Sequence, residues 1–161
     1  MEALLVWLEG SALGQLMRTS GVWAYGVVNL FHILGIATLF GSVLAFDLRL
    51  LGLWRRVPLV ALELPTLTLA VCGFAIAVAS GAAMISTNGT EYIGNPFLII
   101  KFSAIGLGLL NVVVVQFLPA WRARAVEPHA PRQRWALRVV GATSLACWLG
   151  AVAAGRMIGY W

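Results

Sequence analysis

The chain has 161 residues, of which 61% are hydrophobic and 11% are charged. An average soluble domain has about a quarter of its residues charged, so this composition excludes an ordinary soluble protein and predicts a single integral membrane domain, residues 1–161. The net charge of +5 does not indicate nucleic-acid binding, because the basic residues gather in two short loops between apolar runs. Cys72 and Cys147 lie in apolar segments and form no metal or redox motif.

The first 20 residues differ from a secretory signal, because Glu2 and Glu9 stand where a basic region would be and no long apolar core follows. We expect this segment to be retained. Apolar residues recur in it at helical spacing, which predicts one or two short amphipathic helices lying in the membrane interface. These residues are Leu5, Leu8, Ala12 and Leu16. Trp7 and Trp23 would mark the headgroup level.

The first predicted span, residues 23–46, is uncharged and long enough to cross a hydrocarbon core about 30 Å thick. His32 would lie about 13 Å below the surface at the Trp23 end of this span. Asn29 precedes it by one helical turn on the same face. An ionisable side chain is costly inside a membrane, so His32 is a candidate functional residue.

The segment DLRLLGLWRRVPLVALEL, residues 47–64, combines charges with a glycine and a proline and is predicted to be a connecting loop, partly interfacial. Asp47 and Arg49 are two residues apart and would point to different faces of a helix, so we interpret them as interface-anchoring or loop-pairing residues. The second predicted span, residues 65–85, has small residues at four-residue intervals, which let a neighbouring helix approach closely. They are Gly73, Ala77 and Gly81, with Ser80 and Met84 sharing much of their face.

The third predicted span, residues 97–118, carries polar and small residues in one helical stripe, which should face other helices rather than lipid. They are Lys101, Gly108 and Asn111. A basic, proline-rich loop follows, in which we interpret His129 as solvated. The fourth predicted span, residues 137–160, has Arg156 near its end and several small residues suited to packing. These are Gly141, Ala146, Gly150, Ala154 and Gly155.

Basic residues are unevenly distributed between the two sides of these spans. Eight arginines flank the first and third loops, against three basic residues on the other side. The eight are Arg49, Arg55, Arg56, Arg122, Arg124, Arg132, Arg134 and Arg138, and the three are Arg18, Lys101 and Arg156. The positive-inside rule then predicts that both termini face the periplasm or exterior and that the two basic loops lie in the cytoplasm. Four spans with short connections predict an all-α, up-down-up-down bundle of four transmembrane helices.

This topology would bring polar side chains together in the outer half of the bundle. Lys101 and Arg156 would each lie about 6 Å below the outer surface, above His32. Each cation could instead extend to the interface, but two cations at matched depth above a buried histidine predict an anionic ligand. The candidate cofactor-binding residues are His32, Lys101, Arg156, Asn29, Met84 and Met157, with His32 as the metal ligand.

Several segments resemble a family of small bacterial inner-membrane proteins of unknown function. They are the run from WLEGSALGQLMRTSG through HILG to DLRLLG, the NPFLIIK that enters the third span and the closing GRMIGY. More distantly, the pattern is similar to copper-resistance D type membrane domains and to four-helix b-type cytochromes. The resemblance implies a four-helix membrane bundle without an established activity. In this pattern a histidine often follows the third-span asparagine, whereas this chain has Gln116 in NVVVVQF, which argues against a haem held by two histidines.

Three functions are compatible with these residues. The first is a haem b protein that transfers electrons with other membrane or periplasmic redox proteins, in which His32 is an axial ligand and Lys101 and Arg156 pair with the propionates. The second is copper handling, with His32 and Met84 or Met157 as a mixed imidazole and thioether site. The third is a non-catalytic membrane subunit or scaffold, in which His32 makes a structural hydrogen bond.

An enzyme is not predicted, because the sequence shows no nucleophile with a base, no carboxylate pair on one span and no metalloprotease motif. The lipid bilayer is the expected partner in every case, and the sequence is compatible with an oligomer.

Overall fold

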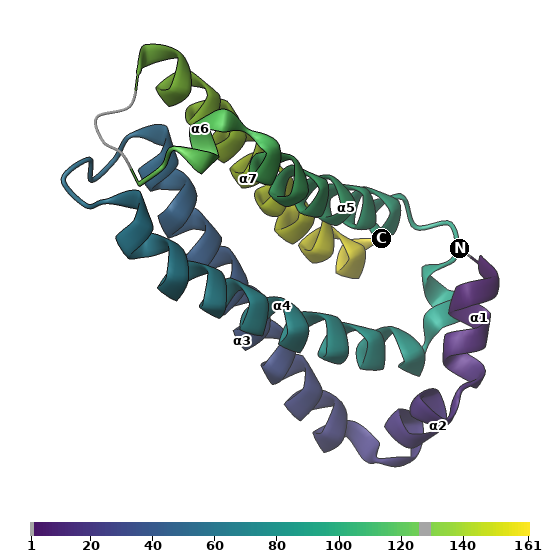
Figure 1. The fold of residues 1–161 in the computed structure, drawn as a ribbon. Coiled ribbons are helices and arrows are strands. Elements are labelled where there is room, and N and C mark those ends of the chain that lie inside the picture. Colours follow the sequence, from purple (N-terminus) through teal and green to yellow (C-terminus); the bar gives the residue numbers. More distant parts are fainter. Residues whose placement is uncertain (1, 126–129) are drawn as a thin grey trace. The chain divides into compact units, whose positions relative to one another are not determined.

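The structure, a computed structural model, describes residues 2–125 and 130–161, and all regular structure within these ranges is helical. Four helices are long and apolar enough to cross a membrane, which confirms the predicted all-α membrane class (Figure 1). They are α3 (Gly21–Leu51), α4 (Leu59–Thr87), α5 (Pro96–Phe117) and α7 (Pro131–Met157). The shorter elements are α1 (Glu2–Gly10), α2 (Ala12–Thr19), α6 (Pro119–Arg122) and the 3₁₀ helices η1 (Gly89–Tyr92) and η2 (Ile158–Tyr160). His129, predicted to be solvated, lies outside the described residues.

The chain divides into two compact units. The first unit comprises Met1–Leu39 and Val71–Pro96, and the second comprises Phe40–Ala70 and Phe97–Trp161. The long helices α3 and α4 each contribute one segment to each unit.

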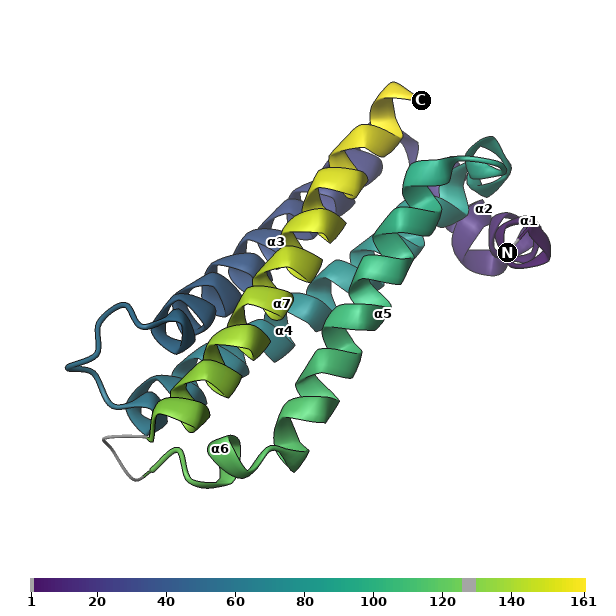
Figure 2. The same ribbon diagram turned by 90° about the horizontal axis from the view of Figure 1, so that it is seen from above.

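In the first unit, α3 and α4 lie side by side and run in opposite directions (Figures 1 and 2). A side chain on Gly35 would come within 2.8 Å of the Ala77 backbone nitrogen, and one on Gly73 within 2.5 Å of the Leu39 nitrogen. Only glycine therefore permits this approach of the two backbones. The close packing predicted from Gly73, Ala77 and Gly81 is confirmed.

The amino-terminal segment forms two helices, α1 and α2, that pack against the end of α4 and against η1 (Figure 1). Ser11 separates them and caps α2, because its side chain accepts a hydrogen bond from the Gly14 N–H at 3.2 Å. The segment thus forms two short helices, as one of the two predicted arrangements had it. Of its apolar residues, Leu5 is buried, whereas Leu16 is 61% exposed. Gly14 packs against the Ser86 carbonyl oxygen.

In the second unit, α5 and α7 pair antiparallel, and the contacts between them follow the predicted stripe of α5 (Figure 2). Lys101 lies along the backbone at Gly155, and the Trp148 ring covers Gly108. Nδ2 of Asn111 donates a hydrogen bond to the Val140 carbonyl at 3.2 Å. The prediction that these α5 residues face another helix is confirmed.

The predicted loop over residues 47–64 is wrong in extent. Helix α3 continues to Leu51 and ends where Gly52 takes a positive φ of +112°. The Leu53 N–H then bonds the Leu48 carbonyl and the Gly52 N–H bonds that of Arg49, which closes the helix with a Schellman motif. Helix α4 begins at Leu59 and includes Pro65. Because proline has no N–H, the second turn of α4 lacks one backbone hydrogen bond there.

Arg49 is therefore helical and buried rather than part of a loop. Its Nε donates a hydrogen bond to the Val57 carbonyl at 2.6 Å, which folds the short connection back onto α3. A hydrophobic core lies beside this connection, where the Phe46 and Trp121 rings meet edge to face with centroids 5.9 Å apart. The core residues are Phe46, Leu50, Leu59, Val115, Ala120, Trp121, Leu137 and Val140.

Candidate functional site

His32 is held at the crossing of α3 and α4 in the first unit. Its Nδ1 lies 3.1 Å from the Ser80 hydroxyl oxygen, and that hydroxyl donates its own proton to the Ile76 carbonyl at 2.5 Å. Because the hydroxyl has one proton, it accepts from His32, so a neutral ring carries its proton on Nδ1.

The imidazole packs closely against α4 because residue 81 is glycine. A side chain there would come within 2.9 Å of Cε1 of His32. Asn29 lies one turn before His32 on α3, and Met84 lies one turn after Ser80 on α4. Since the helices are antiparallel, both residues lie toward the same end of the pair. Both are half-buried.

Lys101, Arg156 and Met157 belong to the second unit. The Lys101 Nζ lies against the α7 backbone, 3.5 Å from the position that a side chain on Gly155 would occupy. The Arg156 guanidinium hydrogen-bonds the Tyr160 hydroxyl and lies 4.7 Å above the ring of that tyrosine. Each cation thus has a contact near the end of α7. The single ligand expected to join them to His32 stays a prediction.

Asp47 is helical and buried against α7, rather than the interface-anchoring or loop-pairing residue that its sequence position predicted. It is only 3% exposed, and Ser144 of α7 supplies a hydrogen bond. Its Oδ2 has no partner among the described residues. Gly141 permits this approach, because a side chain there would come within 3.2 Å of the Asp47 carbonyl oxygen. The small residues of α7 were a signal for packing, but their spacing does not identify the opposing residue.

Polar groups also join the amino-terminal helices to the end of α4. The Thr90 N–H donates to Oε2 of Glu9 at 2.7 Å, which lowers the pKa of Glu9 below its ordinary value. Arg18 donates to the Ser86 and Thr87 carbonyls at 3.4 and 3.2 Å. A cation there satisfies terminal carbonyls and complements the helix dipole. These side chains face the protein.

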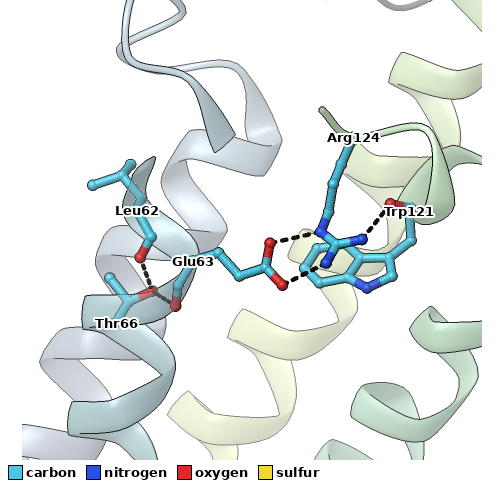
Figure 3. Close-up of polar contacts among 5 residues, drawn as sticks. All are labelled: Leu62, Glu63, Thr66, Trp121 and Arg124. Carbon is cyan, nitrogen blue, oxygen red and sulfur yellow. Dashed lines mark hydrogen bonds and ion pairs between the residues drawn. The ribbon is translucent and has the colours of Figure 1, made fainter. Parts of the chain in front are cut away.

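The second unit has a bidentate ion pair between α4 and the segment after α6 (Figure 3). Nε and Nη2 of Arg124 lie 2.6 and 2.7 Å from the two carboxylate oxygens of Glu63. The guanidinium also lies 4.4 Å above the Trp121 ring, so it is held between a carboxylate and an aromatic face. This hydrogen bonding raises the pKa of Arg124 above its ordinary value.

No group of three or more His, Cys, Asp and Glu side chains that could hold a metal ion occurs within residues 2–125 and 130–161. The helices and their internal polar contacts define a multi-pass α-helical membrane protein. The chain belongs to a family of unknown function, DUF6644, which matches residues 4–161. No curated protein and no solved structure matches the chain. The more distant resemblance to copper-resistance D domains and b-type cytochromes therefore stays a prediction.

Proposed function

We propose that this protein is a non-catalytic subunit or scaffold of the bacterial inner membrane, whose polar residues within the helices hold the helices together. The observation that carries the proposal is the contact of His32 with Ser80 at Gly81. It gives the one histidine in the described ranges a packing role. A polar side chain within a membrane helix that has no packing role would indicate a ligand or substrate site. The bond from Asn111 to the Val140 carbonyl serves packing in the same way.

A second candidate is a haem b protein for electron transfer, with His32 as an axial ligand. The Ser80 contact supports this candidate too, because a metal-ligating imidazole usually donates its other N–H to an oxygen. Bound haem would supply one-electron redox chemistry. Asn29 and Met84 are the predicted cofactor-binding residues that share the first unit with His32. Lys101 and Arg156, the expected propionate partners, belong to the second.

Copper handling has less support, because no cluster of three or more His, Cys, Asp and Glu side chains occurs in the described part of the chain. His32 with Met84 would offer only two ligands to a soft Cu(I) ion.

The visible spectrum of the purified protein, before and after dithionite, separates these candidates. A colourless protein without stoichiometric copper by elemental analysis supports the scaffold. A Soret band with split reduced bands that disappears in His32→Ala supports haem and overturns the scaffold proposal. Stoichiometric copper lost in His32→Ala would support copper handling instead.

A double-mutant cycle tests the packing role directly. If His32 and Ser80 stabilise the helix pair, His32→Ala and Ser80→Ala should show a coupling of about 0.5 to 3 kcal/mol in detergent unfolding. Thr68→Ala is a matched control, because the Thr68 hydroxyl donates to the Leu64 carbonyl of its own helix. Additive effects of His32→Ala and Ser80→Ala would contradict the proposal.

A further inference from the structure

Two guanidinium groups meet above Gly52, at the turn that ends α3. A side chain on Gly52 would begin 3.2 Å from Nη2 of Arg55 and 3.5 Å from Nη2 of Arg138. These two nitrogens, one on the connection and one on α7, are therefore no more than about 7 Å apart, close enough for their charges to repel. Both side chains are exposed.

The side-chain carboxylates described in the second unit contact other groups than Arg55 and Arg138. Glu63 is paired with Arg124, and Asp47 is buried beside Ser144. Nε of Arg55 donates to the Gly52 carbonyl at 3.1 Å, which fixes that guanidinium over the turn. The turn therefore holds one of two neighbouring positive charges in place, at a separation that a bound anion would stabilise.

Exposed apolar side chains lie close to these two arginines in the sequence. Leu53 and Trp54, on the connection itself, are 47% and 55% exposed, and Trp135, one turn before Arg138, is 68% exposed. Trp54 has φ +47°, a strained conformation for a bulky residue. Tryptophan is typical of the headgroup level of a membrane, where one side of the ring is apolar and the other polar.

We propose that Arg55 and Arg138 bind the phosphate of an anionic phospholipid headgroup, with Leu53, Trp54 and Trp135 in the adjoining membrane interface. Planar guanidinium groups donate paired hydrogen bonds to phosphate oxygens. The exposed apolar residues favour a lipid over free phosphate, because a free anion would not cover them. This site is independent of His32 and of the proposed scaffold function.

The test uses the purified full chain in neutral detergent and native mass spectrometry to count bound lipid. Dioleoylphosphatidylglycerol should bind more tightly than dioleoylphosphatidylcholine. Each basic residue near an anionic membrane contributes about fivefold in affinity, so Arg138→Gln should lose about fivefold and Arg55→Gln with Arg138→Gln about 25-fold. The hydrogen bonds of the connection come from Arg49 and Arg55, so Arg138→Gln tests the site even if the double variant unfolds.

Arg132→Gln with Arg134→Gln is the matched control, because it removes the same charge from the start of α7. This control should bind phosphatidylglycerol as the wild type does. An equal loss in the control would show diffuse attraction and overturn the site. Equal binding of the two lipids, or displacement of phosphatidylglycerol by inorganic phosphate at equal concentration, would overturn an anionic-lipid headgroup as its ligand.

Discussion

At Gly81 the His32 ring occupies the space that any side chain on α4 would need. The same ring is anchored through Nδ1 to the neighbouring Ser80, so it cannot move away without losing a hydrogen bond in a low-dielectric setting. A glycine and a hydroxyl at adjacent positions of α4 thus determine where the histidine of α3 lies.

Gly81→Leu should therefore destabilise the first unit by about 1 to 3 kcal/mol, because the new side chain would overlap the imidazole. The measurement is the thermal midpoint of the purified protein in detergent. Val112→Leu on α5 is the control, because Val112 is 44% exposed and has room for one more methylene group. Equal midpoints for the two variants would contradict the assigned contact at Gly81.

Among the elements, α1 and α2 are attached to the end of α4 by charged side chains as well as by apolar contacts. Arg18 and Glu9 provide these bonds, to α4 and to η1 respectively. Their neighbours Trp7 and Leu4 remain 67% and 57% exposed, which leaves an apolar face available to a membrane interface.

The Glu9 contact makes stability depend on pH. The bond from the Thr90 N–H lowers the pKa of Glu9 below 4.5, so the folded carboxylate holds its proton less tightly than the unfolded one. Its stabilising effect is complete above pH 4.5 and is lost as the pH falls through the lower, folded value. Melting midpoints of wild type and Glu9→Gln should therefore differ at pH 6 and converge as the pH falls below 4.5.

Glu2→Gln is the control for this measurement, since Glu2 is an exposed carboxylate on the same helix. A pH-independent difference between wild type and Glu9→Gln would rule out titration of Glu9 as the cause.

The Glu63–Arg124 pair connects α4 to the segment after α6. With 20% and 28% of the two side chains exposed, we expect a coupling of about 1 kcal/mol in a cycle of Glu63→Gln and Arg124→Gln. Arg124→Lys keeps the charge but loses the paired geometry and the contact with the Trp121 ring, so it should recover only part of the coupling. Unfolding in detergent measures both, and full recovery by lysine would show that charge alone matters.

For the whole molecule, the eight-to-three distribution of basic residues predicts the orientation in the membrane. Single cysteines at Arg56 and Glu91, both exposed, test this after Cys72 and Cys147 are replaced by alanine. In spheroplasts, an impermeant maleimide should label Glu91→Cys at once and Arg56→Cys only after permeabilisation. The reverse pattern would contradict the predicted orientation. Lys101 and Arg156 would then not lie near the outer surface, as the haem hypothesis requires.

Composition and the lengths of the apolar runs by themselves determine the four long helices, because a backbone inside a membrane must satisfy its own hydrogen bonds. Periodicity within one helix likewise shows which face packs, as Gly73, Ala77 and Gly81 do on α4. Tertiary structure alone decides the partners across helices. Ser80 is 48 residues from His32 and Ser86 is 68 from Arg18, and these pairings depend on the register between segments. Local spacing contains no information on that register, so the sequence identified His32 but not the hydroxyl that holds it.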